Sequence, residues 1–289
     1  MKKTLLSIAL VISSSLVLAK PYTKSPSEVV AEANSSDWQQ LDPENILKIE
    51  LQTGSVYIVL NPELAPNHVA NIKALAREGF YTNLSMYRFV ENFVAQGGDM
   101  SDKKMPQKGK KAIAAEFFHS TESTLKITSL DAVDGYAPRT GFLNGFAVGQ
   151  NEAGTKTWMT HCVGSFAMAR TNDINSGGTE FYITLTPQRY LDKNTTVFGQ
   201  LLSGMEHVQH LDRKPVTGQA FNVIKGVTVL ADVKGAPSFK RLKTNTPIFE
   251  SLIAARKNRA GDWFVDTPNH IDICSVSVPV EMEDAKGNK

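Results

Sequence analysis

Two short segments of this chain hold the side chains best suited to chemistry. Residues 87–99 read YRFVENFVAQGGD, and residues 165–183 contain the runs SFAMARTND and GTEFYI. The first segment places Arg88 ahead of Gln96. A guanidinium is always charged and carries its N–H donors in a rigid fork, so it can stabilise electron density on a substrate atom without forming a covalent bond. The chemistry indicated is therefore electrostatic.

Two other patterns are weaker candidates for chemistry. Residues 163–167 read VGSFA, which lacks the second glycine of a nucleophile elbow. His161 and Cys162 are adjacent, but neither stands at metal-ligand spacing from another histidine or cysteine. The sequence therefore predicts neither a serine nucleophile nor a metal site.

The two segments resemble the active-site segments of the cyclophilins, the β-barrel peptidyl-prolyl cis-trans isomerases. The pattern R-F-x-x-x-F-V-x-Q-G-G-D at residues 88–99 is restrictive, and the similarity runs from Leu47 to about Val233. Such enzymes rotate the peptide bond that precedes proline, which isomerises only in tens to hundreds of seconds unaided. The resemblance implies a peptidyl-prolyl isomerase that needs no cofactor or metal, because no bond is broken.

The resemblance also implies roles for individual residues. Arg88 matches the family's catalytic arginine, which donates to the prolyl nitrogen and favours the twisted transition state over the planar amide. Gln96 matches the glutamine that holds the guanidinium in place. Further positions match the substrate-binding surface, the first four of them the pocket for the proline ring: Phe93, Val94, Tyr182, Leu191, Ala169, Arg170, Glu180, Tyr190 and Thr195.

Four matched positions depart from the best-known members of the family. Glu180 matters most, because a carboxylate near Arg88 could orient the guanidinium or could compete with the substrate for its donors. It leaves open an alternative function, a cyclophilin-fold binding or chaperone module with weak or no isomerase activity. The departures are Glu180 for a glutamine, Tyr190 for a tryptophan, Thr195 for a histidine and Arg170 for an asparagine.

The remaining sequence predicts the fold that must position these residues. Many short strands with two helices indicate a mainly β fold, a closed antiparallel barrel, and the resemblance adds a helix capping each end. Alternating or apolar runs predict a hairpin at 46–60 and strands at 86–96, 164–169, 180–185, 197–202 and 224–230, and helices are predicted at 66–79 and 204–211.

Three regions lie outside this barrel domain, which we expect to span residues 45–235. Residues 20–44 are polar, contain three prolines and are expected to form a loosely held arm. Residues from about 120 to 160 look like an insertion, in which the runs FAV and TWM predict a hairpin that elaborates the packing. Residues 236–289 form a C-terminal extension packed on the barrel, with a helix that starts after Thr246, then an edge strand near residues 263–265 or 271–280 and a tail.

The chain contains two cysteines, Cys162 and Cys274. In an exported protein an even number of cysteines favours a disulfide. The alternative is two buried thiols that pack as small apolar side chains. Both alternatives stay open at this stage, because the sequence does not show whether the two Cα atoms lie within bonding distance.

The N-terminus predicts export. Lys2 and Lys3 precede an apolar run over residues 5–18, and a cut before Lys20 would remove residues 1–19 as a signal peptide, which is too short to span a membrane. The expected location is the periplasm or an equivalent exported space.

The net charge of the chain limits the classes of partner that we expect. It has 31 basic and 29 acidic residues, and removal of the signal peptide would leave 29 of each. Nucleic acids and anionic membrane surfaces attract proteins with a positive excess, so neutrality argues against both. The expected partners are proline-containing unfolded or extended polypeptides, and the protein is expected to be a monomer without a membrane span.

Overall fold

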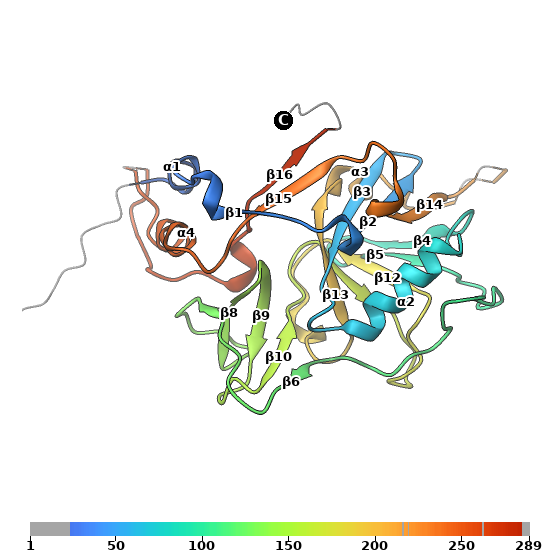
Figure 1. Ribbon diagram of the computed structural model, residues 1–289, viewed down its shortest axis with the longest axis horizontal. Coiled ribbons are helices and arrows are strands. Elements are labelled where there is room, and N and C mark those ends of the chain that lie inside the picture. Colours follow the sequence, from blue (N-terminus) through green and yellow to red (C-terminus); the bar gives the residue numbers. More distant parts are fainter. Residues whose placement is uncertain (1–23, 216, 219, 262, 285–289) are drawn as a thin grey trace, which may run out of the picture.

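The computed structural model describes residues 24–284 except 216, 219 and 262 (Figure 1). The predicted signal peptide, residues 1–19, lies outside this range. Over the described part of the chain, no helix combines the length and the apolar character that a membrane crossing needs.

The centre of the molecule is an eight-stranded antiparallel barrel. Its strands are β2 (Ile46–Leu51), β3 (Ser55–Leu60), β4 (Ser85–Val90), β5 (Val94–Gly98), β11 (Ser165–Met168), β12 (Phe181–Thr184), β13 (Val197–Ser203) and β14 (Ile224–Val229). They pair in the order β14-β2-β3-β13-β11-β12-β5-β4. A bridge between Ser85 and Val223 brings the two edge strands together. The predicted mainly β, closed antiparallel barrel is confirmed.

The barrel interior is filled by the residues that alternate inward along these strands. Phe166, Phe181 and Phe198 are fully buried there, and the ring centroid of Phe166 lies 4.9 Å from that of Phe181 and 4.8 Å from that of Phe198. The helices α2 (Pro66–Arg77) and α3 (Met205–Gln209) add apolar side chains to the same core. Both helices lie where the sequence predicted them.

The stretch at 86–96 is a hairpin and not the single strand that we expected. Strands β4 and β5 are joined by a turn in which Asn92 has a φ of 57°, a left-handed conformation that asparagine tolerates better than most residues. The polar residues Glu91 and Asn92 interrupt the apolar run at this turn, but the apolar residues on both sides of them resemble one continuous strand. The turn places Arg88 directly opposite Gln96.

The insertion forms a second sheet beside the barrel. Its strands are β6 (His119–Ser120), β7 (Thr128–Ser129), β8 (Arg139–Leu143), β9 (Phe146–Gln150) and β10 (Lys156–Met159), in the order β6-β10-β9-β8-β7. Trp158 pairs with Gly149, which confirms the predicted hairpin. Figure 1 shows this green sheet below the N-terminal and C-terminal segments.

The N-terminal arm is packed from residue 24 onward, contrary to our expectation of a loosely held segment. Its helix α1 (Pro26–Ala31) buries Val29 in a core shared with α4 (Pro247–Lys257), and β1 (Trp38–Gln40) pairs with β15 (Ser238–Leu242). The polar composition of the arm did not predict this packing, because only a few of its side chains contact the rest of the protein. The described residues also contain five short 3-10 helices: Ser35–Asp37, Pro43–Asn45, Arg189–Leu191, Leu230–Asp232 and Ile273–Ser275.

The C-terminal extension begins with β15 and continues with the predicted helix, α4, but its edge strand lies later than expected. Strand β16 (Val280–Glu283) pairs with β15, whereas Trp263 is 84% exposed in a loop. A disulfide joins Cys162 to Cys274, with the Cα atoms 4.9 Å apart. Of the two alternatives left open by the sequence, the structure therefore shows the bridge.

Candidate active site

The candidate catalytic residues form one row across neighbouring strands. The registers pair Arg88 with Gln96, Gln96 with Tyr182, and Tyr182 with Ala167. Directly opposed residues share a face of a sheet. Since the adjacent Phe181 belongs to the barrel interior, this row lies on the outer face. The fold thereby brings together the two segments that the sequence singled out.

Arg88 is exposed and is held from two sides. Its Nη1 donates a hydrogen bond of 3.2 Å to Oε1 of Gln96. Its guanidinium carbon lies 5.6 Å from the ring centroid of Phe93, which is within the range of a cation–π contact. The guanidinium therefore stands beside a predicted wall of the proline pocket, where its donors can reach a bound peptide.

Glu180 reaches Arg88 through Gln96. Its carboxylate accepts a 3.0 Å hydrogen bond from Nε2 of Gln96 and another from the hydroxyl of Tyr87, which in turn accepts from the same Nε2. A carboxylate only accepts, so it selects the NH₂ end of the amide and leaves the amide oxygen for Arg88. Of the two effects considered from the sequence, this arrangement corresponds to orienting Arg88.

Tyr87 is a site residue that sequence reasoning missed. Strict alternation would send Tyr87 and Arg88 to opposite faces, but the β4–β5 register shifts between Ser85 and Arg88. Such a bulge re-aims side chains, and both residues reach Gln96. Burial, together with the hydrogen bond to the Glu180 carboxylate, raises the pKa of Tyr87 above its ordinary value, so the hydroxyl keeps its proton.

A glycine allows the Glu180 segment to approach β5. Gly98 has a φ of 129°, and a Cβ atom there would lie 2.7 Å from the carbonyl oxygen of Thr179 and 2.9 Å from the Cα of Glu180. Any larger residue would push that segment away from the sheet. Gly98 therefore serves the contact between Gln96 and Glu180.

The four residues predicted to surround the proline ring belong to one apolar cluster on the outer face. Val94 and Tyr182 are buried in it, while Phe93 and Leu191 are partly buried, as is Ala169. These side chains come from the β4–β5 turn, from β5 and β12, and from the 3-10 helix at residues 189–191.

The other predicted substrate-binding residues line the surroundings of this cluster. The hydroxyl of Thr195 lies 2.5 Å from that of Tyr182, and Tyr190 is 56% exposed on the same loop as Thr195. Arg170 donates to the carbonyl of Asn194 at 2.8 Å. Together with Ala169, Glu180 and Gln96, Arg170 lines a neighbouring cavity of about 470 Å³. Among the residues that the structure describes, no group of three or more His, Cys, Asp or Glu side chains is placed to hold a metal ion.

Comparison with known protein families decides the identity of the barrel. The family model described as "Cyclophilin type peptidyl-prolyl cis-trans isomerase/CLD" matches residues 46–233. The chain belongs to this family. It is a cyclophilin-type peptidyl-prolyl isomerase, an enzyme that acts on prolyl peptides.

Relatives of this cyclophilin are bacterial as well as fungal. A probable peptidyl-prolyl cis-trans isomerase of Brucella suis is 30% identical over 172 residues, which are 60% of this chain and 74% of that protein. Peptidyl-prolyl cis-trans isomerase B of Bacillus subtilis is 30% identical over 157 residues, 54% of this chain and 82% of the relative.

One solved structure is similar well beyond the barrel. The crystal structure of a cyclophilin from Hirschia baltica matches with a TM-score of 0.70 and 27% identity, and the match covers 90% of this chain and 97% of that one. The family model covers only residues 46–233. The insertion and much of the two terminal regions are therefore part of an architecture that this cyclophilin shares with another.

Proposed function

We propose that this cyclophilin isomerises X-Pro bonds in unfolded or extended segments of exported proteins and so assists their folding. The activity class follows from the family; the proposal concerns the residues that perform it and the substrates. The observation that carries it is the chain of contacts from Glu180 through Gln96 to Arg88, which presents a fixed guanidinium beside an apolar pocket.

The proposed mechanism is stabilisation of the twisted peptide bond. Rotation faces a barrier of about 18 to 20 kcal/mol because the amide is resonance-stabilised. In the twisted state the prolyl nitrogen regains a lone pair, to which Arg88 donates while Phe93, Val94, Tyr182 and Leu191 hold the ring. A gain of about four decades over the unaided rate needs roughly 5 to 6 kcal/mol of such differential stabilisation.

The alternative, a binding module that has lost activity, depended on Glu180 competing for the donors of Arg88. The contacts of the Glu180 carboxylate with Gln96 and Tyr87 support orientation of the arginine instead. This geometry favours an active enzyme.

The test of the assigned catalytic residue is an Arg88→Ala variant in a protease-coupled assay on a short proline peptide. We expect a loss of at least two decades in kcat/KM with an unchanged unfolding temperature, because Arg88 is exposed and not needed for packing. Arg213→Ala is a matched control, since Arg213 is also an exposed arginine placed over a phenylalanine, at 3.9 Å from the ring centroid of Phe89. Wild-type activity in a folded Arg88→Ala protein would refute the mechanism.

We propose that the protein is exported and works in the periplasm. Two observations support this location: the signal-like residues 1–19, and a disulfide between Cys162 and Cys274, a bond that persists in oxidising compartments. Fractionation of a Gram-negative host followed by mass spectrometry tests it. We expect periplasmic protein that starts at Lys20 and lacks free thiols; full-length protein confined to the cytoplasm would contradict the proposal.

A further inference from the structure

A fully buried histidine lies behind the proline pocket. Nε2 of His161 is 3.0 Å from the hydroxyl of Tyr182 and 3.0 Å from that of Thr195. The imidazole is stacked on the Tyr182 ring with an angle of 17° between their planes. The sequence had suggested no use for His161 once a metal site was discounted, yet it touches two residues of the predicted substrate surface.

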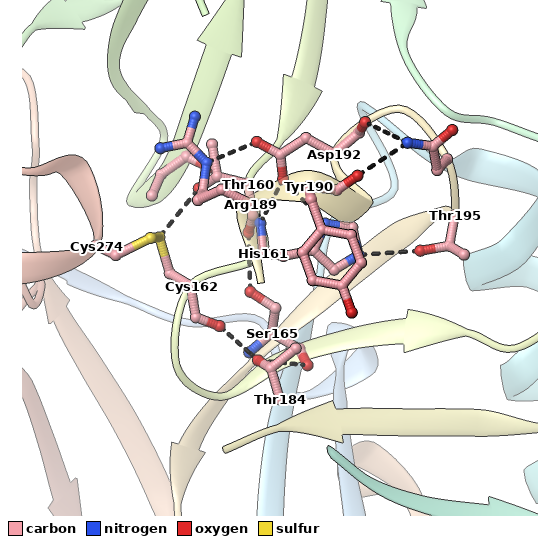
Figure 2. A network of polar contacts seen from close by, with 12 residues as sticks. Thr160, His161, Cys162, Ser165, Thr184, Arg189, Tyr190, Asp192, Thr195 and Cys274 are labelled. Atoms are coloured by element: carbon pink, nitrogen blue, oxygen red, sulfur yellow. Dashed lines mark hydrogen bonds and ion pairs between the residues drawn. A yellow bond between two sulfur atoms is a disulfide. The ribbon is translucent and has the colours of Figure 1, made fainter. Parts of the chain in front are cut away.

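Asp192 holds this imidazole and is itself held by Arg189. Nδ1 of His161 donates to Oδ1 of Asp192 at 3.0 Å, since a carboxylate oxygen can only accept, and the backbone N–H of His161 donates to the same oxygen at 2.9 Å. The other carboxylate oxygen of Asp192 accepts from Nε of Arg189 at 2.6 Å. Figure 2 shows His161 between Asp192 on one side and Thr195 on the other.

The insertion supplies the far end of this network. Asp134 accepts two hydrogen bonds from Arg189, at 2.7 and 3.0 Å, and both side chains are only 5% exposed. The ring centroid of Tyr136 lies 5.2 Å from the guanidinium carbon of Arg189. Nζ of Lys193 lies 4.5 Å from the ring centroid of Trp158 on β10. The insertion therefore contacts the loop at residues 189–195, which also carries Leu191 and Thr195 of the substrate surface.

The segment that carries His161 is itself fixed. The adjacent Cys162 is joined to Cys274, and its carbonyl accepts from the hydroxyl of Thr184 on β12. Ser165 donates from its hydroxyl to the carbonyl of Thr160 at 2.9 Å. These contacts appear in Figure 2 around the imidazole. His161 is thus held in place on a fixed segment, and its imidazole contacts the hydroxyls of Tyr182 and Thr195.

We propose that His161, Asp192 and Arg189 form a buried relay through which Asp134 of the insertion positions the Tyr182 and Thr195 wall of the proline pocket. His161 is then a positioning residue and the insertion a part of the substrate site. The inference rests on the proposed function, because it takes the cluster around Tyr182 to be the place where proline binds.

Such a relay is needed because the hydroxyls of Tyr182 and Thr195 in the pocket wall require hydrogen-bond partners. Thr195 stands where the resemblance places a histidine. His161, from a different segment, brings an imidazole to this place and contacts Asp192 and both hydroxyls. Without it, the buried hydroxyl of Tyr182 would keep its contact with Thr195 but lose the one to the imidazole, and the pocket wall would be held less firmly.

The relay should affect substrate binding more than the chemical step. The walls of the pocket contact proline in the ground state and in the transition state alike, so their displacement removes uniform binding and raises KM. Arg88 acts on the twisted state, and its loss lowers kcat. Replacement of a residue that only stabilises the fold would change neither KM nor kcat in a protein that remains folded.

The experiment compares His161→Leu with a matched control. In the described part of the chain, His68 is the other buried histidine paired with a carboxylate, 2.7 Å from Glu116; it lies on α2, and its ring centroid is 5.7 Å from that of Phe198 in the barrel interior. On a short Ala-Pro peptide we expect His161→Leu to raise KM about tenfold with kcat within twofold, a change of about 1.4 kcal/mol in binding. We expect His68→Leu to leave KM unchanged.

A second variant tests the relay from its outer end. Asp134→Asn lies in the insertion, keeps the shape of the side chain and should also raise KM, by about threefold, with kcat preserved. Combined with His161→Leu, it should add little, because both changes interrupt one chain of contacts. This variant decides the question if His161→Leu does not fold.

Three results would overturn the inference while leaving the proposed function intact. They are a wild-type KM in folded His161→Leu, an equal rise of KM in His68→Leu, and an Asp134→Asn protein whose KM is unchanged. Failure of the proposed function is distinguishable, because it would appear as an inactive wild type or an active Arg88→Ala protein.

Discussion

Replacement of Glu180 tests how the site orients its arginine. Glu180→Gln keeps an oxygen that can accept from both Tyr87 and Gln96, and it removes a negative charge near Arg88. Glu180→Leu removes the acceptor altogether. If the carboxylate serves to orient Gln96, the first variant should be at least as active as the wild type and the second should be impaired.

The size of the second effect follows from the lost contact. A hydrogen bond to a charged group contributes about 1.5 to 3 kcal/mol, and the amide of Gln96 would lose the contact that selects its orientation. Arg88 still favours the same orientation through its own 3.2 Å bond to Oε1, so only part of this energy is lost. We expect kcat/KM to fall about tenfold in Glu180→Leu, or about 1.4 kcal/mol.

The measurement is a protease-coupled assay of both variants, with circular dichroism to establish folding. Glu91→Gln is the control, since Glu91 is an exposed carboxylate in the neighbouring turn and pairs with Arg213. Wild-type activity in Glu180→Leu would show that the carboxylate does not position Gln96. A tenfold loss in Glu180→Gln would show that the charge itself is needed.

Three further predictions concern stability and ligand affinity. Cys274→Ser opens a bridge that spans 112 residues, and on the loop-entropy model the free energy of unfolding should fall by about 4 to 5 kcal/mol; an unchanged urea midpoint would contradict this. Burial alone would raise the pKa of Asp134, but the hydrogen bond from Arg189 lowers this pKa below its ordinary value. The ion pair therefore stabilises the fold at pH values above about 3.8, and this stabilisation is lost as the pH falls below about 3.8. Acid titrations of wild type and Asp134→Asn should therefore differ in slope below that pH and run parallel near neutrality. In cyclophilins sensitive to cyclosporin, the tryptophan at the position of Tyr190 donates an indole N–H to the drug; its absence costs about 1 to 3 kcal/mol, so calorimetry should show binding weaker by one to two decades and a partial recovery in Tyr190→Trp.

Sequence reasoning located the barrel because its evidence is local. Alternating apolar residues mark the strands β2, β3 and β11 to β14 one at a time, and a proline at the first turn marks α2 and α4. It failed where local patterns are shared by two structures. Apolar residues lie on both sides of the short polar pair Glu91 and Asn92, so one strand and a hairpin look alike there, and the polar arm gives no sign that Val29 packs on α4.

The chain by itself determined the chemistry: the spacing of Arg88, Phe93 and Gln96 matches one restrictive pattern, and the structure brings these side chains together. The contacts that tune the chemistry were decided by the tertiary structure alone. Glu180, which directly precedes β12, bonds to Gln96 of the neighbouring strand β5, and His161 bonds to Asp192 of a different loop. A hydrogen bond depends on distance and direction between atoms, and when its partners are remote in sequence, only the folded path of the chain sets both.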